Sequence, residues 1–179
     1  MQKMRIVLII LFGGLSMVLH AQVLKSEQVT ISFFSEAPLE DIESKSDEGV
    51  SALDLATGEI YFKVPIRSFE FKKSLMQEHF NENYLESDKY PYAEFKGAVQ
   101  DWKGMLKDGT YPVRVTGNLN IHGVAKAYTV EGKLLRTAGQ VSVSSVFPVE
   151  VADHHIKIPR LVIKNIAEVV EVKISARYR

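Results

Sequence analysis

The sequence predicts an all-β domain, an antiparallel barrel or sandwich, and three observations carry this prediction. Apolar and polar residues alternate with a period of two along most of the chain. Short turns that contain glycine, such as Ala56-Thr57-Gly58 and His122-Gly123, separate the alternating rows. The chain has no cysteine, so a hydrophobic core has to hold the fold without disulfides. Many short strands at regular spacing are typical of antiparallel barrels and sandwiches.

Residues 1–21 have the features of a signal peptide. Lys3 and Arg5 supply positive charge, and residues 6–18 form an apolar run without an acidic side chain. This run is shorter than the roughly 20 residues with which a helix spans a bilayer. We therefore expect cleavage after Ala21 and export of the mature chain. An uncleaved N-terminal anchor is the alternative interpretation.

Residues 22–179 make up one domain of ordinary size. The whole chain has 22 basic and 22 acidic side chains, and removal of Lys3 and Arg5 leaves the mature chain with two more acidic than basic ones. Because no basic excess is there to neutralise phosphates, the composition argues against a nucleic-acid partner.

In chain order, the alternation gives six rows, each predicted to be a strand. Successive side chains of a strand project to opposite faces, so each row has one apolar face and one wet face. Ser145 and Pro148 weaken the fifth row. The apolar members are Val29, Ile31 and Phe33; Ile60, Phe62, Val64 and Ile66; Tyr111, Val113, Val115, Leu119 and Ile121; Tyr128, Val130 and Leu134; Val141, Val143, Phe147, Val149 and Val151; and Val170, Val172, Ile174, Ala176 and Tyr178.

One segment between the second and third rows departs from this period. In the run FKKSLMQEHFNEN, the residues Leu75, Met76, His79 and Phe80 are three and four positions apart. That spacing places them on one face of a helix. The sequence therefore predicts one short helix around residues 72–82, inserted among the strands.

The alternation alone leaves open which way the apolar face points. A soluble barrel turns this face inward, whereas an outer-membrane barrel turns it toward lipid. Against the second interpretation, Trp102 is the sole tryptophan, the strand ends show no paired aromatic girdles, and an amphipathic helix is foreign to such barrels. We therefore expect an apolar interior and a chain that does not span a membrane.

Four histidines of the mature chain, His79, His122, His154 and His155, are the candidates for metal or acid–base chemistry. None belongs to a paired-histidine helix motif, and no serine-nucleophile or phosphate-binding glycine motif occurs. We therefore predict no catalytic residue, no metal and no cofactor. A metal-assisted enzyme that combines His79 and His122 with one of the other two is the alternative, since separate segments can converge in a fold.

Two runs of the sequence resemble the YceI-like family of polyisoprenoid-binding proteins. In the first, from Ser68 to Gly97, a helix with His79 leads through an irregular segment to Tyr90-Pro91 and Phe95. The second, GNLNIHGV at residues 117–124, resembles the strand-turn motif of that family. The resemblance extends over residues 27–179, with the motifs in the expected order.

This resemblance implies an extended, lipocalin-like, eight-stranded antiparallel barrel whose hydrophobic interior holds a long isoprenoid chain. It also implies a bacterial periplasmic location, which agrees with the predicted signal peptide. One departure concerns the helix, where Met76 occupies the position at which many members carry arginine. The resemblance therefore carries over no basic contact to a ligand head group from that position.

Together these observations predict non-enzymatic binding or transport of an elongated apolar molecule, such as an isoprenoid, a quinone or a fatty lipid. Phe69, Phe71, Met76 and Phe80 are expected to close one end of the barrel, with His79 as a polar contact. The other expected lining residues are Phe62, Val64, Val113, Val115, Leu119, Val130, Leu134, Val143, Phe147, Val170, Val172 and Ile174.

The alternative function is a barrel filled by its own side chains, which acts through protein–protein contacts or in envelope stress tolerance. Small β-barrels either fill their interior or leave room for one small ligand, and alternation does not distinguish the two cases. The sequence also leaves open whether the domain forms a homodimer.

Overall fold

A computed structural model describes residues 23–36, 41–103, 107–158 and 167–179, and the predicted signal peptide lies outside them. Within these residues the chain forms ten strands, so the predicted all-β class is confirmed. The strands are β1 (Val23–Ser35), β2 (Ile42–Ser46), β3 (Val50–Asp54), β4 (Glu59–Pro65), β5 (Glu70–Phe71), β6 (Tyr92–Val99), β7 (Gly109–Ile121), β8 (Val124–Thr137), β9 (Gln140–Glu150) and β10 (Val169–Tyr178).

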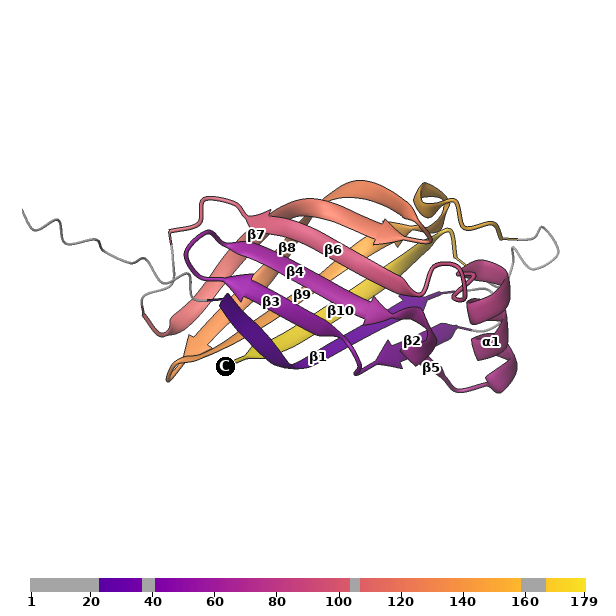
Figure 1. Cartoon of the computed structure of the whole chain (residues 1–179), viewed down its shortest axis with the longest axis horizontal. Coiled ribbons are helices and arrows are strands. Elements are labelled where there is room, and N and C mark those ends of the chain that lie inside the picture. Colours follow the sequence, from indigo (N-terminus) through magenta and orange to yellow (C-terminus); the bar gives the residue numbers. More distant parts are fainter. Residues whose placement is uncertain (1–22, 37–40, 104–106, 159–166) are drawn as a thin grey trace, which may run out of the picture.

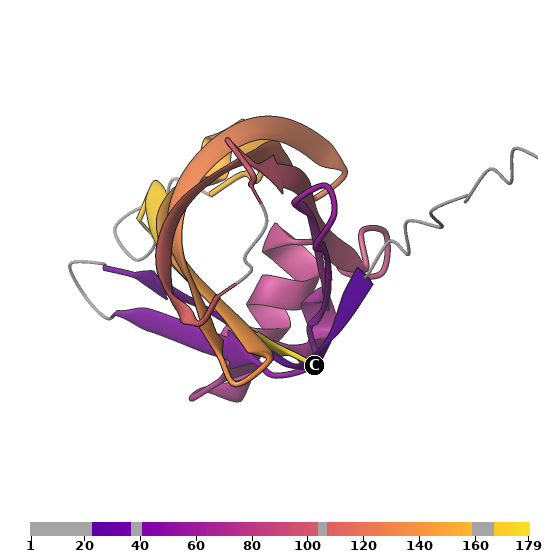
Figure 2. The same cartoon turned by 90° about the vertical axis from the view of Figure 1, so that its left-hand side faces the viewer.

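Eight of these strands close into an antiparallel barrel, as the family resemblance implies. Their order around the ring is β1-β10-β9-β8-β7-β6-β4-β3. The ring closes at β1, which pairs with β10 along one edge and with β3 along the other. Figure 1 shows the barrel from the side, and Figure 2 shows the ring of strands from the end opposite the helix.

The two remaining strands lengthen one side of the barrel. β1 continues past β3, and its last residues, Ile31–Ser35, pair with β2. β2 in turn pairs with the two-residue strand β5. This extension lies at the end of the barrel where the helix is found (Figure 1).

The predicted short helix is present and lies across one end of the barrel (Figures 1 and 2). It begins as α1 (Ser74–His79) and continues as a π-helical turn, η2 (Phe80–Tyr84). Of the four residues on the predicted helical face, Leu75 points away from the interior, with 59% of its side chain exposed. The helix rests on the rim of the barrel, so a narrow stripe of its residues, rather than the whole apolar face, contacts the interior.

The inward face of the barrel is apolar along all six predicted rows, which confirms the direction of the alternation. At the end opposite the helix the interior is tightly filled, by Leu53, Leu134, Val141 and Tyr178, each at most 2% exposed. The hydroxyl of Tyr178 donates a hydrogen bond to the Ser51 hydroxyl (2.5 Å), which itself donates to the Tyr61 carbonyl oxygen (2.7 Å). Burial raises the pKa of Tyr178 to about 12.

The barrel wall is incomplete between β8 and β9. Their pairing joins Gly132–Thr137 to Gln140–Ser145, at the filled end. Toward the helix end, the described residues show no pairing between residues 124–131 of β8 and residues 146–150 of β9. There a short 3₁₀-helix, η3 (Val151–His154), packs against β8 and covers the gap.

No helix in the described part of the chain is both long and apolar enough to cross a membrane.

Candidate ligand-binding cavity

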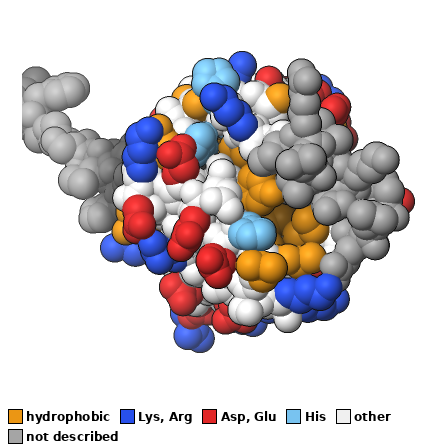
Figure 3. Space-filling view, turned by 90° about the vertical axis from the view of Figure 1, so that its right-hand side faces the viewer, with side chains coloured by type: hydrophobic (Ala, Val, Ile, Leu, Met, Phe, Trp, Pro, Cys, Tyr) orange, Lys and Arg blue, Asp and Glu red, His pale blue; other side chains and the backbone are white. Residues whose placement is uncertain are grey.

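The helix end of the barrel contains a cavity of about 560 Å³. Small-molecule sites in proteins typically measure about 300–1,000 Å³. Inward side chains of six ring strands form its walls, and α1 with η2 covers part of its opening. Figure 3 shows this end of the molecule, where hydrophobic side chains gather in a patch with polar side chains around it.

Most of the sequence-predicted lining residues surround this cavity. Those on the ring strands reach it because every second side chain of a barrel strand points inward. The residues around the cavity, from strands, the helix and the connection before β5, are Phe62, Val64, Phe69, Phe71, Met76, His79, Phe80, Leu119, Phe147, Val170, Val172 and Ile174.

The other predicted lining residues do not reach the cavity. They surround a separate small void of about 60 Å³ in the other half of the barrel. The reason is that large aromatic side chains fill the middle of the interior and divide it in two. The residues displaced from the expected site are Val113, Val115, Val130, Leu134 and Val143.

Further lining residues escaped the sequence prediction. Some belong to the predicted rows, where alternation could have identified them: Ile31, Phe33, Ile66, Ile121, Val149 and Val151. Others lie in segments whose period of two is weak or absent, so no pattern pointed to them: Ser35, Ile42, Tyr84, Leu85, Ala93, Ile156 and Ile158.

Four phenylalanines cluster at the rim and anchor the helix to the barrel. The ring of Phe80 lies 5.6 Å from that of Phe33, 5.7 Å from Phe69 and 5.0 Å from Phe71, measured between centroids. Such pairs contribute about 0.5–1.5 kcal/mol beyond the burial of their area. Aromatic packing of Phe80 therefore helps to hold the helix over the opening.

The charged groups at the edge of the cavity are engaged with one another. Lys63 Nζ lies 3.4 Å from Glu94 Oε1, and the Tyr61 hydroxyl donates to the same carboxylate at 2.8 Å. The hydrogen bond from Tyr61, aided by Lys63, holds the pKa of Glu94 below its ordinary value. The inner walls therefore offer mostly hydrocarbon surface, and the exposed His79 at the rim offers a polar contact for a head group.

Two of the candidate histidines form a hydrogen-bonded network at the gap between β8 and β9. His154 is fully buried, and its Nδ1 donates to the Val124 carbonyl oxygen at 3.0 Å. Its Nε2 is then the acceptor for the Tyr128 hydroxyl, 3.3 Å away. His122 connects the network to the segment after the helix, with Nδ1 3.2 Å from the His154 carbonyl oxygen and Nε2 2.6 Å from Glu86 Oε2.

This network makes a pH-dependent contribution to stability. Burial holds the pKa of His154 below its ordinary value of 6.5, since the charged ring is poorly solvated. Below pH 6.5, His154 therefore binds a proton more readily in the unfolded chain than in the folded chain. We expect the free energy of unfolding to fall as the pH decreases through this range.

Urea unfolding at several pH values, from about pH 7.5 to about pH 5, checks this expectation. The comparison is His154→Asn, whose side-chain amide can donate in place of Nδ1 but does not titrate. The variant should lose less stability than the parent on acidification, although it starts from a lower value. Asp153 and Lys126, which also face this ring, are present in both proteins. Equal losses of stability in the two proteins would therefore show that His154 is not the source of the pH dependence.

His79 does not join the network that His122 and His154 form. His122 and His154 direct their ring nitrogens at Glu86, Tyr128 and backbone carbonyls, while His79 lies at the cavity rim. Among the described residues, no three histidine or acidic side chains are grouped so that they could hold a metal ion. The geometry thus gives the metal-enzyme alternative no site in this part of the chain.

Comparisons with known proteins agree with this architecture. A family model described as the YceI-like domain matches residues 21–178. Curated protein sequences give no match to the chain.

Solved structures of similar fold include proteins from three organisms. A polyisoprenoid binding domain from Saccharophagus degradans, implicated in plant cell wall breakdown, matches with a TM-score of 0.76 and 15% identity, over 89% of this chain and 99% of that one. BcnA from Burkholderia cenocepacia matches with a TM-score of 0.71 and 18% identity, over 83% and 95% of the two chains. The YCEI protein of Campylobacter jejuni matches with a TM-score of 0.60 and 12% identity, over 80% of this chain and 88% of that one. At these identities the likeness establishes the fold.

Proposed function

The chain belongs to the YceI-like domain family, and from this premise we propose that its barrel binds one elongated apolar molecule and releases it chemically unchanged. The observation that carries the proposal is the cavity of about 560 Å³, whose inner walls are hydrocarbon and whose opening lies beneath a helix. Isoprenoids, quinones and fatty lipids have the shape and chemistry that such a cavity accepts.

The driving force would be the removal of hydrocarbon from water, which contributes about 0.8 kcal/mol for each buried CH₂ group. The cavity is preformed on strands of a closed barrel, so few protein groups have to be ordered when a ligand binds. The name of the Saccharophagus degradans relative, a polyisoprenoid binding domain, supports an isoprenoid as the first candidate.

We also propose that the mature protein acts in the periplasm after removal of residues 1–21. The support is the sequence of that segment, with its basic start and short apolar run. Sequencing of the N-terminus of protein recovered from the periplasmic fraction tests this location. A start near Gln22 is expected, whereas recovery of the intact chain in the membrane fraction would favour an uncleaved anchor.

Thermal unfolding in the presence of a prenyl alcohol or a prenylated quinone tests binding. A ligand that binds the folded state alone adds about 2.7 kcal/mol of stability when its concentration is 100 times Kd. The melting temperature should therefore rise with ligand concentration. No change with any of these compounds would instead favour a protein that acts through its outer surface, for which the filled half of the barrel is the supporting observation.

A further inference from the structure

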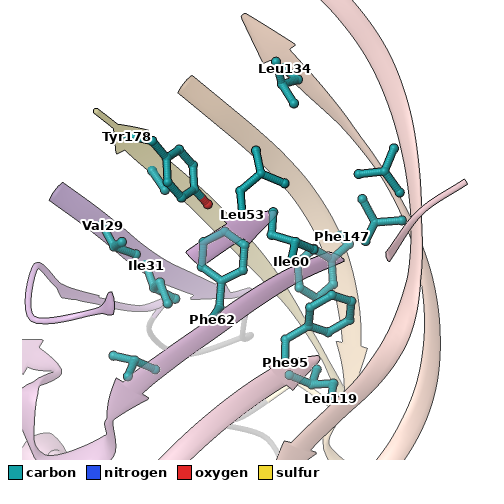
Figure 4. Close-up of a cluster of buried hydrophobic side chains, with 14 of the residues drawn as sticks. Val29, Ile31, Leu53, Ile60, Phe62, Phe95, Leu119, Leu134, Phe147 and Tyr178 are labelled. Atoms are coloured by element: carbon teal, nitrogen blue, oxygen red, sulfur yellow. The ribbon is translucent and has the colours of Figure 1, made fainter. Parts of the chain in front are cut away.

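The large cavity and the small void meet at one layer of side chains. Phe62, Phe95, Phe147 and Ile174 line both spaces, and they come from four different strands, β4, β6, β9 and β10. The three phenylalanines are 7–8% exposed, so little room is left around their rings. Figure 4 shows them together with Ile60 and Leu119 inside the barrel.

The ring of Phe95 is held in place by two glycines. Gly97 follows it on the same face of β6, and Gly117 of β7 is the direct partner of Gly97 across the sheet. A Cβ atom at Gly97 would lie 2.7 Å from Phe95 Cε1, and one at Gly117 would lie 2.7 Å from Phe95 Cζ. The ring therefore lies over both glycines and fills the space that their missing side chains leave, toward the far half of the barrel.

Beyond this layer, the described residues leave little room for a ligand chain. The void measures about 60 Å³, against about 560 Å³ on the helix side. Leu134, Val141 and Tyr178 complete the filled end. A chain that enters at the helix end is thus stopped at the layer formed by Phe62, Phe95, Phe147 and Ile174.

We propose that these four side chains are the floor of the binding site and set the length of the apolar chain that it takes. This inference rests on the proposed function. A cavity of 560 Å³ holds about 19 water molecules at roughly 30 Å³ each, and a methylene group occupies a similar volume. The site therefore accepts on the order of 20 carbons, or four isoprene units, and the rest of a longer chain stays outside the opening at the helix end.

The chain has to bend inside this space. Val170, near the start of β10, and Ile174 at the floor both line the cavity and are four residues apart on this strand, which corresponds to ~13 Å at about 3.3 Å per strand residue. An extended chain of about 20 carbons is longer than this depth. The flexible single bonds of isoprenoid and acyl chains permit such bending, whereas a rigid fused-ring molecule of equal volume is expected to bind less well.

The test is the affinity of the mature protein for a series of prenyl alcohols from two to eight isoprene units. For the parent protein, affinity should rise severalfold with each unit up to about four and by less than twofold per unit beyond that. We call the chain length at which this increase levels off the break. In Phe95→Ala the ring no longer separates the two spaces, so the break should move about one isoprene unit toward longer chains.

Phe95→Leu provides a milder variant, which retains most of the packing and should move the break in the same direction by less. Val141→Ala is the matched control. It removes buried carbons at the filled end, and Val141 lines neither space. This control should lose stability and keep the break of the parent.

The possible failures are distinguishable. If no alcohol of any length binds, the proposed function fails and the floor fails with it. If all lengths bind and affinity rises evenly to eight units, a binding site exists but the floor does not. If the parent shows the break and neither Phe95 variant moves it, the length limit has another origin.

Discussion

Replacement of Val172 by tryptophan is expected to lower the affinity for an apolar chain at least tenfold. Val172 points into the cavity from β10, between Phe33 of β1 and Phe147 of β9 in the strand register. An indole at this position would occupy space that the ligand needs. Because it enters a cavity instead of a packed core, the 1–3 kcal/mol cost of overpacking should largely be avoided.

The matched control for this substitution is Lys173→Trp, one residue further along the same strand. Lys173 points outward, and its ion pair with Glu171 (3.0 Å) is exposed, so its loss should cost no more than about 1 kcal/mol. Titration of both variants with the same prenyl alcohol compares the two faces of β10. Equal affinities for the inward and outward tryptophan variants would show that the ligand binds elsewhere.

Replacement of Leu134 by alanine is expected to destabilise the protein by about 2–5 kcal/mol. Leu134 is 1% exposed, at the filled end of the barrel. The substitution removes buried hydrocarbon and enlarges a void that the closed ring of strands cannot collapse around. Since the domain as a whole is expected to be stable by about 5–15 kcal/mol, this is a large fraction of the total.

Leu135→Ala is the control, since it makes the same chemical change one position away, where the side chain is 44% exposed and points outward. Its cost should lie within about 0.5 kcal/mol. Urea unfolding of both variants measures the difference, which should be seen in the midpoint at an unchanged slope. A small loss for Leu134→Ala would mean that this half of the barrel is not the densely packed core described above.

The alternation predicted the inward face correctly where large apolar residues fill most of every second position, as in β4, β7 and β10. It missed β3 and β6, whose inward positions include Ser51, Ala93 and Gly97. These small residues are needed where a hydroxyl caps Tyr178 and where the ring of Phe95 crosses to β7. Packing inside the barrel, rather than strand formation itself, dictates them, so a local pattern cannot reveal them.

The division of the interior into an open and a filled half could not be predicted from the rows. Val113 and Val172 have the same place in the pattern, yet Val172 lines the large cavity and Val113 lines the small void. The difference depends on where the rings of Phe62, Phe95 and Phe147 point, which is a matter of long-range packing. Lining residues such as Ile156 and Ile158 come from a segment after η3, whose path no periodicity specifies.

In the cell, the cavity at the helix end is expected to hold one apolar chain. Native mass spectrometry of mature protein purified without detergent from its own envelope fraction, followed by extraction into organic solvent, tests it most directly. We expect one lipophilic molecule per chain, lost on extraction and retained by Lys173→Trp but not by Val172→Trp. A mass equal to that of the bare chain, unchanged after incubation with prenyl alcohols and quinones, would contradict it.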